Sequence, residues 1–196
     1  MRIAAPLDGF PRARVVDGDW SDGDGPLDLL SAAVLLGARA WMERELHRVV
    51  GGWTRTAGDG VAVLADRLAM AHARRGEVLY ARLPQLRELP ADSLVTSPGE
   101  RTDAVVHHLV HLDDDGLRLA AWAAVSAEMT RAYEEQLRRC TPVADAPLLR
   151  CLPPLLDELA RDRAAVEAVG RTIDTISGVP DGQLAALLGA SARLTA

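Results

Sequence analysis

The chain has 196 residues, a length that fits one domain with its own hydrophobic core. Hydrophobic residues make up 48 % of it and aromatic residues only 4 %, so the core must consist mainly of Leu, Ala and Val, a composition that suits helices better than sheets. The formal net charge is −6 and no basic face stands out, which argues against nucleic acid or a membrane as the partner.

The N-terminal region indicates a cytoplasmic protein. No apolar run near Met1 is long enough for a secretory signal, and no window reaches the ~20 apolar residues of a membrane span. We therefore expect Cys140 and Cys151 to be two reduced thiols, because nothing else in the sequence supports a disulfide framework.

The first half of the chain predicts an irregular arm and a helical hairpin. Residues 1–25 are rich in Gly, Pro and Asp, which is typical of an irregular segment. A helix is predicted from Pro26, capped by Asp24, to Gly51-Gly52. A second helix is predicted over 59–87, with a kink or an early end at Pro84.

The second half predicts a long crossover and another hairpin. The connection 88–115 carries a short helix capped at Ser97, with Pro98 at its first position. Helices follow over 117–140 and 145–176, and Pro153-Pro154 are expected to delay the start of the latter. A short helix is predicted over 181–194. The domain division is thus an arm (1–25), a four-helix bundle (26–176) and a C-terminal tail (177–196).

Two hairpins joined by one long crossover are the connectivity of ferritin-like bundles. The chain also resembles the ferritin-like superfamily in its residues. His72-Ala73 and Arg82-Leu83-Pro84-Gln85-Leu86 are similar to the second helix of small members, and Asp157-Glu158 to the fourth. The resemblance covers residues 27–176 and implies an all-α, ferritin-like four-helix bundle.

The same comparison predicts that the usual di-iron centre is absent. In the family, each hairpin supplies a Glu and a Glu-x-x-His pair to the metal ions. Here Ala69 stands where the first pair needs Glu, and Arg161 stands where the second needs His. A guanidinium at the site opposes cation binding and can pair with the carboxylates instead. We therefore expect no metal and no cofactor.

Helical spacing selects the candidate site residues. His72 lies between Ala69 and Gly76 on one face of its helix, and these small residues leave either room for a pocket or space for tight helix packing. Asp162 falls inside an apolar stripe and needs a partner, for which Arg75, Arg161 and His72 are candidates. The spacing does not decide whether Glu43 or Glu45 faces inward. The candidates for acid–base catalysis are His72, Glu128, Glu158 and Asp162, and those for substrate binding are Arg75, Arg161, Glu45, Ala69, Gly76, Trp41, Trp122 and Tyr133.

A second histidine group lies on the crossover. Asp103, His107, His111 and Asp115 follow at four-residue steps, and His-x-x-x-His on a helix is a known zinc-binding pattern. Four ligands along one helix cannot surround an ion, so we interpret this group as a polar outer face.

Three functions follow as hypotheses. The first, whose metabolic setting rests on the resemblance, is a metal-independent enzyme of specialised metabolism that isomerises, cyclises or eliminates a small-molecule substrate by acid–base or templating catalysis. His72 would be its proton shuttle. The second is a non-catalytic binding or partner protein with a bundle centre closed by salt bridges. The third is an iron-dependent oxygenase with an incomplete ligand set. A homodimer is left open.

Overall fold

Helices are the only regular structure in residues 25–85 and 89–177, the part of the chain that the computed structural model describes. They are α2 (Leu29–Trp53), α3 (Asp59–Tyr80), α4 (Ala91–Leu94), α5 (Glu100–Val110), α6 (Asp115–Arg139) and α7 (Ala146–Ser177). The all-α prediction is confirmed. The N-terminal arm and the helix predicted over 181–194 lie outside the described residues, apart from Gly25.

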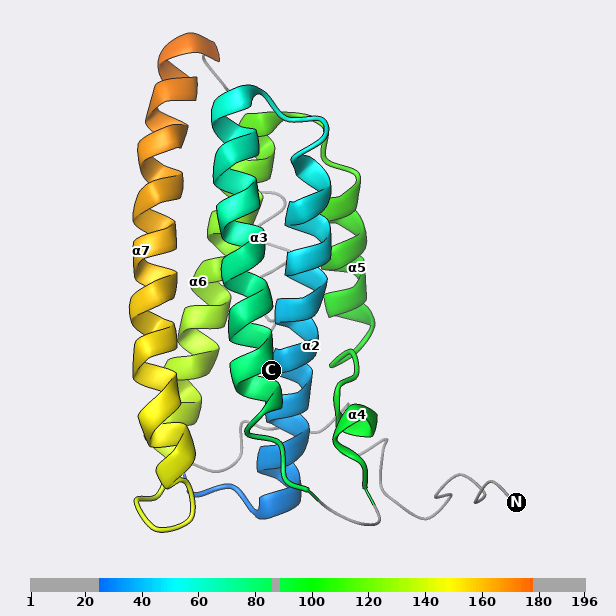
Figure 1. Ribbon diagram of the computed structural model, residues 1–196, viewed down its shortest axis with the longest axis vertical. Coiled ribbons are helices and arrows are strands. Elements are labelled where there is room, and N and C mark those ends of the chain that lie inside the picture. The colour runs from blue at the N-terminus through cyan, green and yellow to red at the C-terminus, as the bar shows by residue number, and fades with distance from the viewer. Residues whose placement is uncertain (1–24, 86–88, 178–196) are drawn as a thin grey trace, which may run out of the picture.

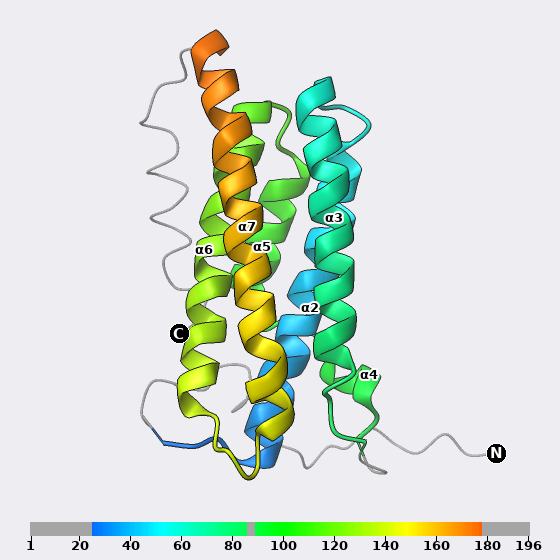
Figure 2. The ribbon, with the colours of Figure 1, turned by 60° about the vertical axis from the view of Figure 1, so that its left-hand side comes forward.

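The four long helices lie side by side (Figure 1). α2 rises and α3 descends as one hairpin, and α6 descends and α7 rises as the other. Figure 2 shows the two hairpins facing each other, and α3 also contacts α7. The connection between the hairpins carries α4 and α5, which pack along α2.

Aspartates begin two of the long helices. The Asp28 carboxylate accepts a hydrogen bond from the Ser31 backbone N–H at 2.9 Å, and Asp114 does the same for Leu117 at 2.8 Å. Such bonds satisfy amide groups that have no partner inside the helix. The start of α2 therefore lies a few residues beyond the predicted Asp24 cap. α5 begins at Glu100 and not near Ser97, because Gly99 has a φ of 144°, which redirects the chain there.

Of the two predicted effects of proline, one is confirmed and the other is wrong. α3 ends at Tyr80, ahead of Pro84, so the early end is confirmed. α7 instead runs through Pro153 and Pro154 without a break. Both prolines are exposed, so they lie on the side of α7 where solvent can hydrate the carbonyl groups that lose their partners.

The core is built from stripes of alternating three- and four-residue spacing, one on each long helix. The buried stripes are Leu36, Arg39, Glu43, Leu46, Val50 and Trp53 on α2; Val61, Ala65, Leu68, His72, Arg75 and Leu79 on α3; Leu119, Trp122, Ser126, Met129, Tyr133 and Gln136 on α6; and Leu148, Leu152, Leu155, Leu159, Asp162 and Val166 on α7. Polar residues thus occupy core positions on every long helix, most of them near the middle of the bundle, with Arg39 and Gln136 nearer one end.

The crossover is fixed to α2 by close backbone contact. A Cβ atom at Gly37 would overlap the carbonyl oxygen of Leu94 in α4, so this position accepts only glycine without a shift. Trp53 Nε1 donates to the Leu109 carbonyl of α5 at 3.2 Å. None of the described helices has the length and apolarity that a membrane span requires.

Candidate functional site

Six buried side chains form a hydrogen-bonded group at the centre of the bundle, which we call the central network. They are Glu43 of α2, His72 and Arg75 of α3, Trp122 and Tyr133 of α6, and Asp162 of α7. All are buried, and Glu43, His72 and Arg75 are fully inaccessible to solvent. All six belong to the core stripes, so the helical period that buries the leucines also buries them.

Glu43 is the hydrogen-bond acceptor shared by three members of the network. Its Oε2 lies 2.6 Å from His72 Nδ1, and Arg75 Nε donates to both its oxygens at 3.0 and 3.2 Å. The Tyr133 hydroxyl donates to Oε1 at 2.7 Å. Burial opposes the charge on Glu43, but His72, Arg75 and Tyr133 outweigh it and hold the pKa of this carboxyl below its ordinary value. Glu43 is therefore a carboxylate.

Both nitrogens of His72 are engaged. Trp122 Nε1 donates to His72 Nε2 at 2.9 Å, and an indole N–H can only donate. Nε2 therefore carries no proton, so the neutral ring carries its proton on Nδ1 and donates it to Glu43, while Arg75 Nη2 lies 3.0 Å from the same nitrogen. Burial is the main cause that lowers the pKa of His72, although the neighbouring Glu43 raises it. A proton on Nε2 would face the Trp122 N–H directly.

Arg75 joins two acids. Its Nη1 donates to Asp162 Oδ2 at 2.8 Å, while its Nε binds Glu43. Arg75 is thus the residue, among the three considered, that pairs with Asp162. Burial lowers the pKa of Arg75, but the two carboxylates outweigh that effect and raise it. Asp162 is the outermost member of the network, and the exposed Arg67 lies 3.9 Å from its Oδ1.

The central network does not fit the metal ions that the ferritin-like resemblance implies. In the described ranges, no group of three or more His, Cys, Asp or Glu side chains is placed to hold an ion. The Arg75 guanidinium bridges Glu43 and Asp162, so a fixed positive charge stands between the two central carboxylates. Trp122, moreover, donates to the nitrogen with which His72 would bind a metal.

Four of the candidate residues lie outside the network, three of them partly buried and Arg161 exposed. Glu45 pairs with Arg48 at 2.6 Å, Glu128 pairs with Arg131, and Glu158 lies 2.7 Å from Arg74. Arg161 is exposed and donates to the Asp157 carbonyl at 3.2 Å. Adjacent helical residues point about 100° apart, so a buried Asp162 turns Arg161 outward. The positive charge expected from Arg161 comes from Arg75.

The small residues beside His72 lie against α2. A Cβ atom at Gly76 would meet Glu43 Cβ at 3.4 Å and the Ala40 carbonyl at 3.7 Å. Ala69 Cβ lies 3.6 Å from the position of a Cβ atom at Gly51. Ala69 and Gly76 therefore allow α2 and α3 to approach closely, which is the tight-packing alternative for these positions. Trp41 is partly buried and packs against the core.

Sequence reasoning left Glu43 undecided and did not single out Arg39 or Gln136. Arg39 donates to Gln136 Oε1, and both side chains are buried. Glu43 and Arg39 lie four residues apart and continue the stripe from Leu36 to Leu46. That spacing is a partial signal for Arg39 and Glu43, and Gln136 similarly lies three residues after Tyr133 on the stripe of α6.

The crossover histidines form an exposed pair. The rings of His107 and His111 lie 4.3 Å apart, and both residues are exposed. Asp115 is the first residue of α6, where it accepts from the Gly58 N–H at 2.8 Å and pairs with Arg118. The four residues are thus not gathered around one point.

Comparison with known proteins adds no relative: no family model, curated protein or solved structure matches this chain.

Proposed function

We propose that this chain is a ferritin-like four-helix bundle whose centre is closed by a salt-bridged network, and that it works as a non-catalytic binding or partner protein. The up, down, down, up order of its long helices with a single long crossover supports the ferritin-like assignment. So do the residues around His72 and Asp157-Glu158 that resemble the family.

One observation carries the non-catalytic reading: His72 has no free nitrogen and no exposed surface. A catalytic base must reach the proton that it abstracts, within hydrogen-bond distance or through one water. Here Glu43 and Trp122 occupy both ring nitrogens, and Gly76 packs its helix against α2 on the side where the sequence left a pocket open as an alternative. The network stabilises the packing of the two hairpins and leaves binding to the outer surfaces.

The second candidate function is a metal-independent enzyme, and one observation favours it. A carboxylate 2.6 Å from an imidazole, with a phenol and a guanidinium on the same carboxylate, is a set of groups suited to proton transfer. A small-molecule substrate would reach His72 only if the hairpins separate. The edge near Asp162 is where solvent approaches the network most closely.

Imidazole nitrogen NMR on the full chain separates the two candidates. For a closed network we expect His72 to keep the neutral form with its proton on Nδ1 between pH 6.5 and 8, with slow exchange of that proton. Its signals should not move when Fe²⁺, Mn²⁺ or a library of small organic compounds is added, while the exposed His107 and His111 provide reference signals. A compound that displaces the His72 signals would contradict the non-catalytic reading and favour the enzyme.

A further inference from the structure

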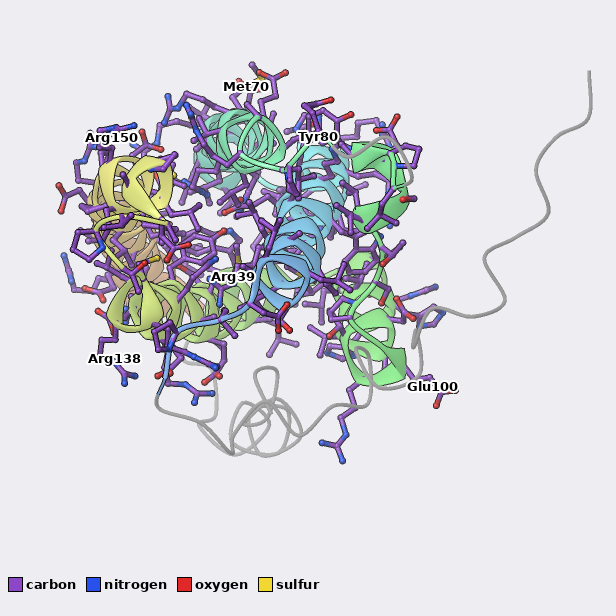
Figure 3. All side chains as sticks on the ribbon, turned by 90° about the horizontal axis from the view of Figure 1, so that it is seen from below. Arg39, Met70, Tyr80, Glu100, Arg138 and Arg150 are labelled. Atoms are coloured by element: carbon purple, nitrogen blue, oxygen red, sulfur yellow. The ribbon has the colours of Figure 1, made fainter. Side chains whose placement is uncertain are left out.

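A second buried arginine, Arg39, lies nearer the lower end of the bundle, and among the described residues it has no acidic partners like those of Arg75. Arg39 is 8 % exposed, and Figure 3 shows it between α2 and the α6–α7 hairpin. Its Nη1 donates to Gln136 Oε1, and its guanidinium carbon lies 5.4 Å from the centre of the Tyr133 ring. Within residues 25–85 and 89–177, no carboxylate lies at ion-pair distance from it.

Burial makes the charged form of Arg39 less favourable. Burial lowers the pKa of Arg39 to about 10, and Tyr133, Cys140 and Glu135 offset only part of that shift. The side chain therefore stays protonated at neutral pH. A buried charge without an opposite charge is strongly unfavourable, which is why such charges are normally paired.

Gln136 provides the second, independent observation. A guanidinium can only donate, so the amide oxygen of Gln136 must face Arg39. The amide nitrogen Nε2 is then left with its N–H groups, and it is buried without a hydrogen-bond partner among the described residues. Buried donors without an acceptor are rare in folded proteins. Helices from the two hairpins thus bring the Arg39 guanidinium and an unpartnered Gln136 amide to the same part of the interior.

The nearby groups in the described part of the chain do not supply the missing negative charge. Burial raises the pKa of the Cys140 thiol to about 11, so this thiol is neutral at pH 7. Glu135 lies next to Gln136 on α6 but pairs with Arg138. The Tyr133 hydroxyl is already used on Glu43, and burial raises its pKa well above its ordinary value.

We infer that Arg39 and Gln136 form a binding site for the carboxylate group of a small monoanion. A carboxylate matches the planar fork of a guanidinium, and its oxygens can also accept from the Gln136 amide. One arginine balances one negative charge, so a dianion such as sulfate or hydrogen phosphate would leave a buried charge uncompensated. This site is separate from the central network and stands whether or not the centre is catalytic.

Acetate is the probe, tested on the full chain by thermal unfolding against sodium chloride at equal ionic strength. At about ten times its Kd, acetate should raise Tm by roughly 3–6 °C beyond the effect of chloride, in a saturable manner. Arg39→Met should abolish this rise. Gln136→Glu should raise Tm without any ligand, since it places a carboxylate beside Arg39, and should also abolish the response to acetate.

Glu135→Gln is the matched control, because it changes the neighbouring, partly exposed residue of α6 and should keep the acetate response. The inference is overturned if acetate and chloride act alike, or if the acetate effect survives in Arg39→Met. It is also overturned if Gln136→Glu lowers Tm, or if sulfate gives a saturable rise in Tm as large as that of acetate and Arg39→Met abolishes that rise. Gln136→Glu remains informative even if Arg39→Met does not fold.

Discussion

Replacing Glu43 by Gln should be among the most destabilising single changes in this protein. Among the described residues, Glu43 is the only acceptor for the Nδ1–H of His72, and it also accepts from Arg75 and Tyr133. A Gln side chain has almost the same shape, but it keeps only one acceptor oxygen. Its NH₂ group must then face a donor of His72, Arg75 or Tyr133, and the buried Arg75 loses one of its two charged partners.

The magnitude follows from the burial of the pair. Removing one partner of a buried ion pair costs about 3–5 kcal/mol, because the other charge stays buried and unpaired. Domains of this kind have a total free energy of unfolding of about 5–15 kcal/mol. Glu43→Gln should therefore lose a large share of the stability of the chain, while an exposed pair contributes under about 1 kcal/mol.

Glu45→Gln is the matched control, since it is the same change two residues along α2, at an exposed pair with Arg48. We would measure urea unfolding of both variants by circular dichroism and by tryptophan fluorescence. We expect Glu43→Gln to lower the unfolding free energy by about 3–5 kcal/mol and Glu45→Gln by under about 1 kcal/mol, both with unchanged m-value. Equal midpoints for the two variants would refute the placement of Glu43 at the centre of the network.

Three further predictions concern pH, packing and capping. The pKa of His72 in the folded chain lies below 6.5, so its contribution to the free energy of unfolding should be fully present above pH 6.5. Below that pH, the free energy of unfolding should fall by up to about 1.4 kcal/mol per pH unit. Urea titrations at each pH would measure this slope, which should be smaller in His72→Gln. Gly37→Ala should destabilise by about 1–3 kcal/mol through its clash with Leu94, whereas Gly60→Ala, with open space around it, should stabilise by up to about 1 kcal/mol in the same assay. Asp28→Ala should lower Tm, since losing a helix cap costs about 1 kcal/mol; an unchanged Tm would argue against that cap.

Much of the fold follows from local patterns in the sequence. The leucine and alanine periodicity predicts the long helices, and their connections predict two hairpins and a crossover. Pro153 and Pro154 show the limit of this reasoning, because their effect depends on which side of α7 faces solvent. That side is fixed by the packing of the whole bundle, which no local pattern contains.

The candidate site was predictable in part. His72, Trp122, Tyr133 and Asp162 all lie on stripes of apolar residues, so their inward placement follows from spacing alone. The spacing on α2 is more ambiguous, because acids two residues apart point to opposite sides and each has apolar neighbours. Which acid faces inward was settled by partners on α3 and α6, at sites distant in the sequence.

The bonds between the hairpins also bear on how the chain folds. They join residues separated by 50 positions for Trp122–His72, 87 for Arg75–Asp162, 90 for Tyr133–Glu43 and 97 for Arg39–Gln136. Contacts within each hairpin close much shorter loops and should form first. The docking of the two preformed hairpins is then the late event in folding. Changes in the central network should accordingly speed unfolding more than they slow folding, so these buried charges govern the lifetime of the folded state.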